Sequence, residues 1–197
     1  MKLCTEIEEL LARQHGTLTS GDLAKLGVSR TMVGKYVAAG LLEHVERGVY
    51  TRPGEIADEM FVLAKRCGRL VFSHGSALFV LGMSERMPFR HAVSLRSSVT
   101  LPNRIRECVD CFYVKDALFE IGLTSANTQF GNAVPCFDLE RTICDLVRDR
   151  TRLGEEDFLS AIKRYAASPA RNLAKLGEYA IRMGIEGRVN ATMEMLV

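Results

Sequence analysis

The chain has 197 residues, of which 47% are apolar and 25% are charged, and this composition excludes a largely disordered protein. The formal net charge is only +2, which excludes a general polycation, so any surface that binds nucleic acid has to be a local patch. The amino terminus lacks the apolar segment of a secretion signal, and no run approaches the roughly 18 apolar residues of a membrane span. We therefore expect a cytoplasmic protein that does not bind membranes.

Three short helices are predicted at the amino terminus, over residues 3–14, 22–27 and 29–39. The second follows a capping box that starts at Thr19, and Ser29 is a good cap for the third. A tight turn that contains glycine separates the second helix from the third. This spacing is typical of a helix-turn-helix motif.

The third predicted helix has an apolar inner face and a small, cationic outer face. Val33 and Val37 share the inner face, while Arg30 and Lys35 point outward. A glycine inside a helix costs about 1 kcal/mol relative to alanine, so Gly34 indicates either close packing or close approach of a partner backbone. Taken alone, such a helix is typical of a solvated basic surface.

The residues that follow change this interpretation. Residues 41–52 alternate around the turn 46-ERG-48, which predicts two short strands. A helix-turn-helix followed by a hairpin is the winged-helix arrangement, and such motifs place their second helix in the major groove of DNA. The candidate DNA-binding residues are Thr19, Ser29, Arg30, Thr31, Gly34, Lys35, Arg47, Tyr50 and Arg52.

These candidates have different expected roles. Arg30 is the best base reader, because its guanidinium can form a bidentate contact with guanine. Thr31 can reach a base or a phosphate, and Lys35 is better placed for a phosphate. The hairpin residues are expected to meet the flanking backbone or the minor groove: Arg47, Tyr50 and Arg52.

The sequence after residue 53 predicts a second domain, so we divide the chain into a DNA-binding domain, 1–53, and a mixed α/β domain, 54–197. The first predicted helix of the second domain covers 55–67, with Ile56 and Met60 directed inward. Further predicted elements are strands at 69–73, 91–96 and 109–115, a helix at 76–82, strands between 118 and 137, and helices at 138–148, 155–166, 170–183 and 186–196. The predicted fold class is α+β: a winged helix-turn-helix domain, then a mixed α/β domain with a carboxy-terminal helical bundle.

The second domain shows no catalytic constellation. Ser76 does not lie in a G-x-S-x-G elbow, and Ser73 and Ser76 are expected to cap the following helix. Asp145 shares a helix face with Arg141 and Arg148, which predicts an ion pair. The sequence contains no P-loop and no dinucleotide fingerprint. We therefore expect neither an enzyme nor a cofactor.

The six cysteines are scattered among apolar neighbours, which indicates reduced packing residues. One pair, Cys108 and Cys111, has C-x-x-C spacing, but a zinc site needs a second pair of ligands. Residues three apart on a strand also point to opposite faces. We expect no metal site.

The sequence resembles the AbiEi family of antitoxins over 16-GTLTSGDLAKLGVSRTMVGKYVAAGLLEHVERGVYTRPG-54. The segments 70-LVFSHGSALFVLGM-83 and 137-FDLERTICDLVRD-149 resemble further segments of that family. The resemblance implies a type IV toxin-antitoxin system that acts in abortive phage infection. It implies a winged-helix repressor that binds inverted repeats in its own promoter, with a second domain that counteracts a nucleotidyltransferase-like toxin. The expected partners are double-stranded DNA of its own promoter and a toxin encoded by the adjacent gene. One possible arrangement on the DNA is a dimer.

The strongest local charge bias lies between Arg86 and Arg106, where five arginines and no acid occur: Arg86, Arg90, Arg96, Arg104 and Arg106. One interpretation is a second surface for phosphates or for an acidic patch on a toxin, with Phe89 as an anchor. In the other interpretation, Arg90, Arg96 and Arg104 pair with carboxylates of neighbouring helices. Both interpretations stay open at this point.

Three other functions are compatible with the sequence. A stand-alone regulator would carry a ligand- or protein-sensing second domain. An enzyme targeted to DNA would turn over a nucleotide or nucleic acid with Mg²⁺, through Asp145. A winged helix that binds only protein would keep its partner after Arg30 and Lys35 are removed.

Overall fold

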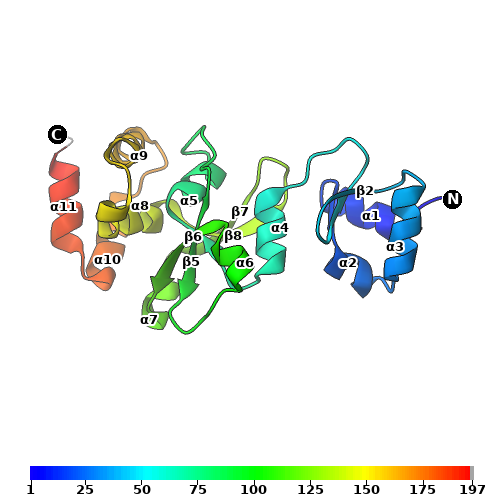
Figure 1. The fold of residues 1–197 in the computed structure, drawn as a ribbon. Coiled ribbons are helices and arrows are strands. Elements are labelled where there is room, and N and C mark those ends of the chain that lie inside the picture. Colours follow the sequence, from blue (N-terminus) through cyan, green and yellow to red (C-terminus); the bar gives the residue numbers. More distant parts are fainter. Residues whose placement is uncertain (196–197) are drawn as a thin grey trace. The chain divides into compact units, whose positions relative to one another are not determined.

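The computed structural model describes residues 1–195, which form two compact units (Figure 1). Unit 1 contains Met1–Gly68 and the separate segment Asn127–Ala133, and unit 2 contains Arg69–Ala126 and the chain from Val134 onward. The division does not follow the boundary after residue 53 that the sequence suggested. A helix after that boundary and a turn from much later in the chain both pack with the amino-terminal elements.

Unit 1 is built from four helices and a three-stranded sheet. The helices are α1 Thr5–Arg13, α2 Ser20–Lys25, α3 Arg30–Ala38 and α4 Glu59–Arg66, and the strands are β1 Thr17–Thr19, β2 Glu43–Glu46 and β3 Val49–Thr51. The strand order is β1-β3-β2, and both pairings are antiparallel. The predicted helices and hairpin are confirmed. Strand β1 was not predicted, because three residues are too few to show an alternating pattern.

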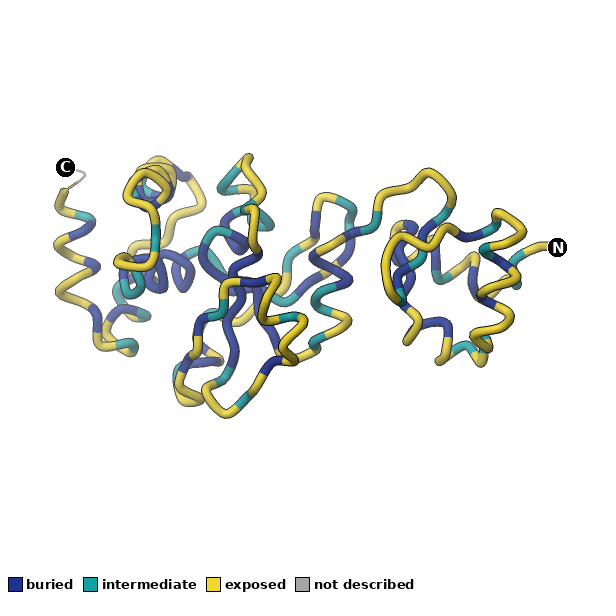
Figure 2. The backbone as a smooth tube through the Cα atoms, viewed as in Figure 1, coloured by how far each residue is buried: buried dark blue, intermediate teal, exposed yellow. Residues whose placement is uncertain are grey.

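The core of unit 1 lies between α1, α2, α3 and the sheet (Figure 2). Its buried members are Ile7, Leu11, Leu18, Leu23, Val33, Tyr36 and Leu42. On α3, Val33 and Tyr36 are buried, while Val37 is half-buried. The prediction that Val33 faces inward is confirmed, and Tyr36 contributes the larger buried surface.

Helix α4 starts later than the sequence pattern predicted. Asp58 caps it, because a carboxylate oxygen accepts a hydrogen bond from the Phe61 amide at 3.1 Å. Met60 is buried, as predicted, but the prediction for Ile56 is wrong. Ile56 precedes the cap and is 77% exposed, because residues before a helix do not follow its periodicity.

Unit 2 contains a five-stranded mixed sheet in the order β6-β5-β4-β8-β7. Its strands are β4 Val71–Phe72, β5 His91–Arg96, β6 Val109–Val114, β7 Leu123–Asn127 and β8 Ala133–Phe137. Strand β4 pairs antiparallel with β5 and parallel with β8, and β5 pairs parallel with β6 in unbroken register. Helix α5 His74–Val80 contacts β5, and two one-turn helices, α6 Asn103–Arg106 and α7 Asp116–Phe119, join the strands.

Four helices follow the sheet: α8 Leu139–Arg148, α9 Glu155–Ala167, α10 Leu173–Met183 and α11 Glu186–Glu194, with a short 3₁₀ turn η1 Arg150–Arg152. They pack around α8, which is buried along most of its length (Figure 2). The predicted end of the last helix at residue 196 lies outside the described residues. The prediction of a mixed α+β protein is confirmed. Within residues 1–195, each helix is too short or too polar to traverse a bilayer.

Two arginines flank one buried carboxylate on α8. The Arg141 Nε lies 3.1 Å from both oxygens of Asp145, and an Arg148 nitrogen lies 2.9 Å from the same carboxylate. Arg141 and Asp145 are fully buried. The predicted ion pair is confirmed, with Asp145 shared between two cations.

The prediction that Ser73 and Ser76 cap α5 with their side chains is wrong. Ser73 occupies the cap position, but its hydroxyl forms no capping bond and lies 3.0 Å from His74 Nδ1. The Ser76 hydroxyl accepts a hydrogen bond from the Ala92 amide at 2.9 Å and so joins α5 to β5. Both serines are fully buried, so each hydroxyl needs a partner; Ser76 has one on β5, and Ser73 has one in the ring of the adjacent His74.

Asp149 makes a pH-dependent contribution to the stability of unit 2. Burial alone would raise its pKa, but contacts with His74 at 3.1 Å and Arg148 at 2.7 Å lower the pKa to about 2. A carboxylate with a depressed pKa stabilises the fold above its unfolded value near 4, and this stabilisation is lost as the pH falls toward 2.

We expect the free energy of unfolding to decrease by about 2 kcal/mol between pH 5 and pH 2 through this group alone. The variant Asp149→Asn should be less stable at pH 7 and should lack this part of the acid dependence. Urea unfolding of both proteins at several pH values measures the difference. Parallel pH curves for the two proteins would contradict the assignment.

The most deeply buried cysteines behave as packing residues. Burial raises the pKa of Cys136 and of Cys144 to about 12, so both thiols stay protonated at neutral pH. Both lie in the core, as predicted for reduced cysteines. The C-x-x-C pair is more accessible, with Cys108 exposed and Cys111 half-buried.

Candidate nucleic-acid interface

The helix-turn-helix is held by a network at the start of α2. The Thr19 hydroxyl accepts from the Asp22 amide at 3.2 Å, while the Asp22 carboxylate accepts from the Thr19 amide at 3.0 Å, which completes the predicted capping box. Gly27 then adopts a φ of +74°, which suits glycine, and lets the chain turn into α3. The local sequence therefore specifies where α2 begins and where the chain turns toward α3.

Helix α3 presents an exposed cationic face. The Ser29 hydroxyl accepts a hydrogen bond from the Met32 amide at 3.2 Å, so the predicted cap is confirmed. Arg30, Thr31 and Lys35 are exposed, and Arg30 and Lys35 form no ion pair with any residue in the described part of the chain. Their charges are therefore free to meet an anionic partner.

Gly34 lies on the same exposed face as Arg30 and Lys35. A methyl group built on its Cα meets nothing within 4 Å, apart from the helix's own nearby backbone. Close packing within residues 1–195 therefore does not explain the glycine, and close approach of a partner backbone stays a prediction.

The hairpin of β2 and β3, residues 43–51, forms the wing. Its strands pair His44 with Tyr50 and Glu46 with Val49, with an irregular register between the two pairs. Gly48 has a φ of +73° in the turn, and its carbonyl accepts a hydrogen bond from the Ser20 amide at 2.8 Å. The wing turn is thus attached to the start of α2.

The predicted wing residues differ in their availability. Arg47 is exposed, and no side-chain contact of its guanidinium is found in residues 1–195. Tyr50 is half-buried, packs on the core and lies 5.3 Å from the His44 ring. Arg52 is half-buried and lies 3.8 Å from Glu55. Arg47 is the cation best exposed on the wing.

The structure removes Thr19 from the exposed surface. Only 8% of this residue is accessible, and its hydroxyl also donates to Asp22 at 2.7 Å. The amide and the hydroxyl of Thr19 are both engaged in the capping box, so this residue stabilises the start of α2 and does not face solvent.

Two residues of this region were not identified from the sequence. Met32 lies in the first turn of α3 with 37% of its surface exposed, where a thioether can contact a thymine methyl group. Arg66 lies at the end of α4 and contacts the wing. The solvent-facing position of Met32 could have been found from the helical period, but the contact of Arg66 depends on tertiary packing.

The arginine-rich stretch in unit 2 is partly neutralised. The Arg90 Nε lies 3.0 Å from an Asp110 oxygen, and Arg96 pairs with Glu120. Ion pairs are therefore confirmed for these two arginines, but Asp110 lies on strand β6 rather than on a helix, and the pairing expected for Arg104 is not found among residues 1–195. Across residues 1–195, no ion pair is found for the other three: Arg86, Arg104 and Arg106. Phe89, next to Arg90, is fully exposed.

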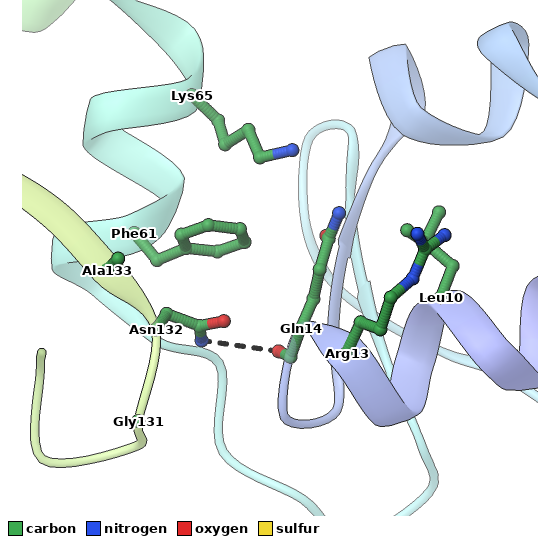
Figure 3. Close-up of a pocket in the computed structure, with 8 residues that line it drawn as sticks. All are labelled: Leu10, Arg13, Gln14, Phe61, Lys65, Gly131, Asn132 and Ala133. Atoms are coloured by element: carbon green, nitrogen blue, oxygen red, sulfur yellow. Dashed lines mark hydrogen bonds between the residues drawn. The ribbon is translucent and has the colours of Figure 1, made fainter.

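Unit 1 also contains a pocket of about 460 Å³ (Figure 3). Its lining residues are Leu10, Arg13, Gln14, Phe61, Lys65, Gly131, Asn132 and Ala133. Much of its polar lining is engaged: Lys65 Nζ lies 2.8 Å from Asp22, and Asn132 donates to the Gln14 carbonyl at 3.2 Å (Figure 3). These contacts join α1, α2, α4 and the turn 127–133.

Comparisons with known proteins agree with the amino-terminal geometry. Residues 6–53 match the family model described as transcriptional regulator, AbiEi antitoxin. A comparison with curated proteins gives no match. The crystal structure of the RV2827C protein from Mycobacterium tuberculosis is similar, with a TM-score of 0.52 and 16% identity, over 96% of this chain and 80% of that chain. At that identity the similarity shows a shared fold alone.

The family match covers the helix-turn-helix and the wing, and the resemblance noted for 70–83 and 137–149 stays a prediction. The description of the matched family names two roles, transcription regulation and action as an antitoxin. The amino-terminal segment of this chain, residues 6–53, therefore matches the model of the AbiEi antitoxin family of transcriptional regulators, the family that its motifs predicted.

Proposed function

We propose that this protein is a DNA-binding autorepressor and antitoxin of a type IV toxin-antitoxin system. The observation that supports the proposal is the exposed face of α3, where Arg30, Thr31 and Lys35 are accessible to solvent and the two cations lack an ion-pair partner in residues 1–195. Unpaired cations on the second helix of a helix-turn-helix fit the major groove. The family match of residues 6–53 adds transcription regulation and an antitoxin role.

In this mechanism some residues of the surface contact the DNA backbone and others contact the bases. Lys35, Arg47 and Arg52 contact phosphates and fix the register of the protein on the duplex, while Arg30 and Thr31 supply sequence preference. Two molecules would occupy an inverted repeat upstream of the gene. Each recognition helix would then enter the major groove one helical turn from the other, or a multiple of that distance.

Unit 2 is proposed to counteract a nucleotidyltransferase-like toxin encoded by the adjacent gene, and to lack catalytic activity. The carboxylate that an enzyme would use, Asp145, is buried between Arg141 and Arg148. A catalytic carboxylate has to reach a substrate or a metal ion. The burial and pairing of Asp145 therefore favour a structural role.

The test of DNA binding is the variant Arg30→Ala. We expect affinity for the duplex upstream of the gene to fall by about 1 to 3 kcal/mol, with relaxed preference at one base pair, because a bidentate base contact is lost. Fluorescence anisotropy across a salt series, with a scrambled duplex beside the native one, measures both effects.

The matched control is Lys35→Ala on the same helix. It should weaken binding to both duplexes equally and lower the salt dependence by about one phosphate contact. An equal loss on both duplexes for Arg30→Ala would make Arg30 a phosphate contact. Weak binding of the unmodified protein to both duplexes alike would reject the autorepressor and favour a protein-interaction module.

A further inference from the structure

Helix α4 lies outside the family-matched segment 6–53, yet it contacts β1, α2 and the wing. At its start, the Asp58 amide donates to the Thr17 hydroxyl of β1 at 3.0 Å. In its last turn, Lys65 reaches Asp22 of the α2 capping box at 2.8 Å. These contacts hold α4 along its length on the remainder of unit 1.

The last residue of α4 reaches the wing itself. One terminal nitrogen of Arg66 donates to the Arg47 carbonyl at 2.6 Å, and the other lies 3.0 Å from the Glu46 carboxylate. The planar guanidinium thus bridges two consecutive residues at the wing turn, which a single point charge cannot do with the same geometry.

The wing needs such a support because its own pairing is short. Strand β3 has three residues, and the register to β2 is irregular beside Glu46. Strand β1 pairs with β3 on the other side, but it also has only three residues, and β2 lies at the edge of the three-stranded sheet. Apart from the strand pairing, the wing turn is held by the Ser20 amide and by Arg66.

We propose that Arg66 is a positioning residue that fixes the wing relative to α2 and β1, so that the DNA-binding unit extends through α4. This inference rests on the proposed DNA-binding function. Arg66 acts through Arg47: it holds the carbonyl of the residue whose side chain faces the DNA backbone. The wing cation is then presented in one orientation, and less conformational entropy is lost when the complex forms.

The first experiment uses the free, full-length protein and does not depend on DNA. In Arg66→Ala, we expect amide hydrogen exchange to become about tenfold faster at Val49 and at Ser20, whose amide donates to the Gly48 carbonyl, because local opening of the turn costs less. The matched control is Arg69→Ala, which removes another exposed arginine with no contact to the wing among residues 1–195. Exchange at α1 and α3 reports whether the fold is intact.

The second experiment is hydroxyl-radical footprinting and anisotropy on the duplex that the unmodified protein binds. Arg66→Ala should weaken binding about fivefold and lower the salt slope by about 1, the effect of one lost phosphate contact. Protection should be lost at the flanks and kept at the centre of each half-site. Arg66→Lys should restore only part of the flanking protection, because lysine lacks the bidentate fork.

The outcomes separate the two proposals. If Arg66→Ala and Arg69→Ala show the same exchange at the wing and the same footprint as the unmodified protein, Arg66 does not position the wing. If exchange is unchanged but affinity falls, Arg66 contacts DNA directly and the positioning role is wrong. If the unmodified protein binds no duplex, the proposed function fails, and the exchange measurement alone decides whether Arg66 holds the wing.

Discussion

Replacing Asp145 by alanine is expected to destabilise unit 2 by about 3 to 5 kcal/mol, the usual cost of removing one partner from a buried ion pair. Arg141 is fully buried, and its guanidinium also donates to the Leu118 and Ile121 carbonyls at 2.6 and 2.7 Å. Without Asp145 this cation keeps its hydrogen bonds to carbonyls but loses its counter-charge. Urea unfolding followed by circular dichroism measures the loss.

The matched control is Glu156→Gln, an exposed carboxylate in the first turn of α9, which should change stability by less than about 0.5 kcal/mol. The double variant Arg141→Met with Asp145→Leu should recover part of the stability, because it removes both buried charges. If Asp145→Ala unfolds at the same urea concentration as the unmodified protein but abolishes a Mg²⁺-dependent activity, Asp145 is catalytic and the structural role is wrong.

The second large effect is expected at Asp58, which is 1% exposed and joins three segments of unit 1. One oxygen accepts from the Phe61 amide, and the other accepts from the Thr128 hydroxyl at 2.6 Å and from the Asn132 amide group at 2.9 Å. Asp58→Ala leaves the Phe61 amide and the Thr128 hydroxyl without this acceptor and removes one of the two acceptors of the Asn132 amide group, which should cost about 3 kcal/mol in total.

The loss at Asp58 should be local before it is global. Hydrogen exchange should increase first in α4 and in the turn 127–133, since both are held by this carboxylate. Glu8→Gln, an exposed carboxylate on α1, is the control and should leave exchange in both segments unchanged. Unchanged exchange in Asp58→Ala would show that the turn is held by other contacts. Because α4 also carries Arg66, the variant should reduce DNA binding as well.

The amino-terminal part of the fold could be predicted because its signals are local. The Thr19 capping box, the Ser29 cap and Gly27 each act over a few residues, and all three occur where the sequence placed them. The same holds for the ion pair of Arg141 and Asp145, which are one helical turn apart. Such features depend on backbone geometry that short segments specify by themselves.

The errors arose where distant segments compete with local preference. Ser76 looks like a helix cap, but its buried hydroxyl accepts from the Ala92 amide of β5; the Ser73 hydroxyl lies instead beside the ring of the adjacent His74. Ile56 continues a helical pattern in the sequence, but the cap at Asp58 starts α4 after it. Thr19 was counted both among the DNA-binding residues and among the helix caps. It is buried, and the structure shows only its role as a cap.

The sequence by itself thus determined the helix-turn-helix, the wing and the face of α3 that carries Arg30 and Lys35. Only the tertiary structure decided that α4 and the turn 127–133 belong with them, and that Arg66 reaches the wing. The physical reason is the length scale of the interactions. Caps and helical periodicity join residues a few positions apart, whereas Asp58 meets Thr128 and Asn132 across some seventy positions of chain, a pairing that only the folded backbone creates.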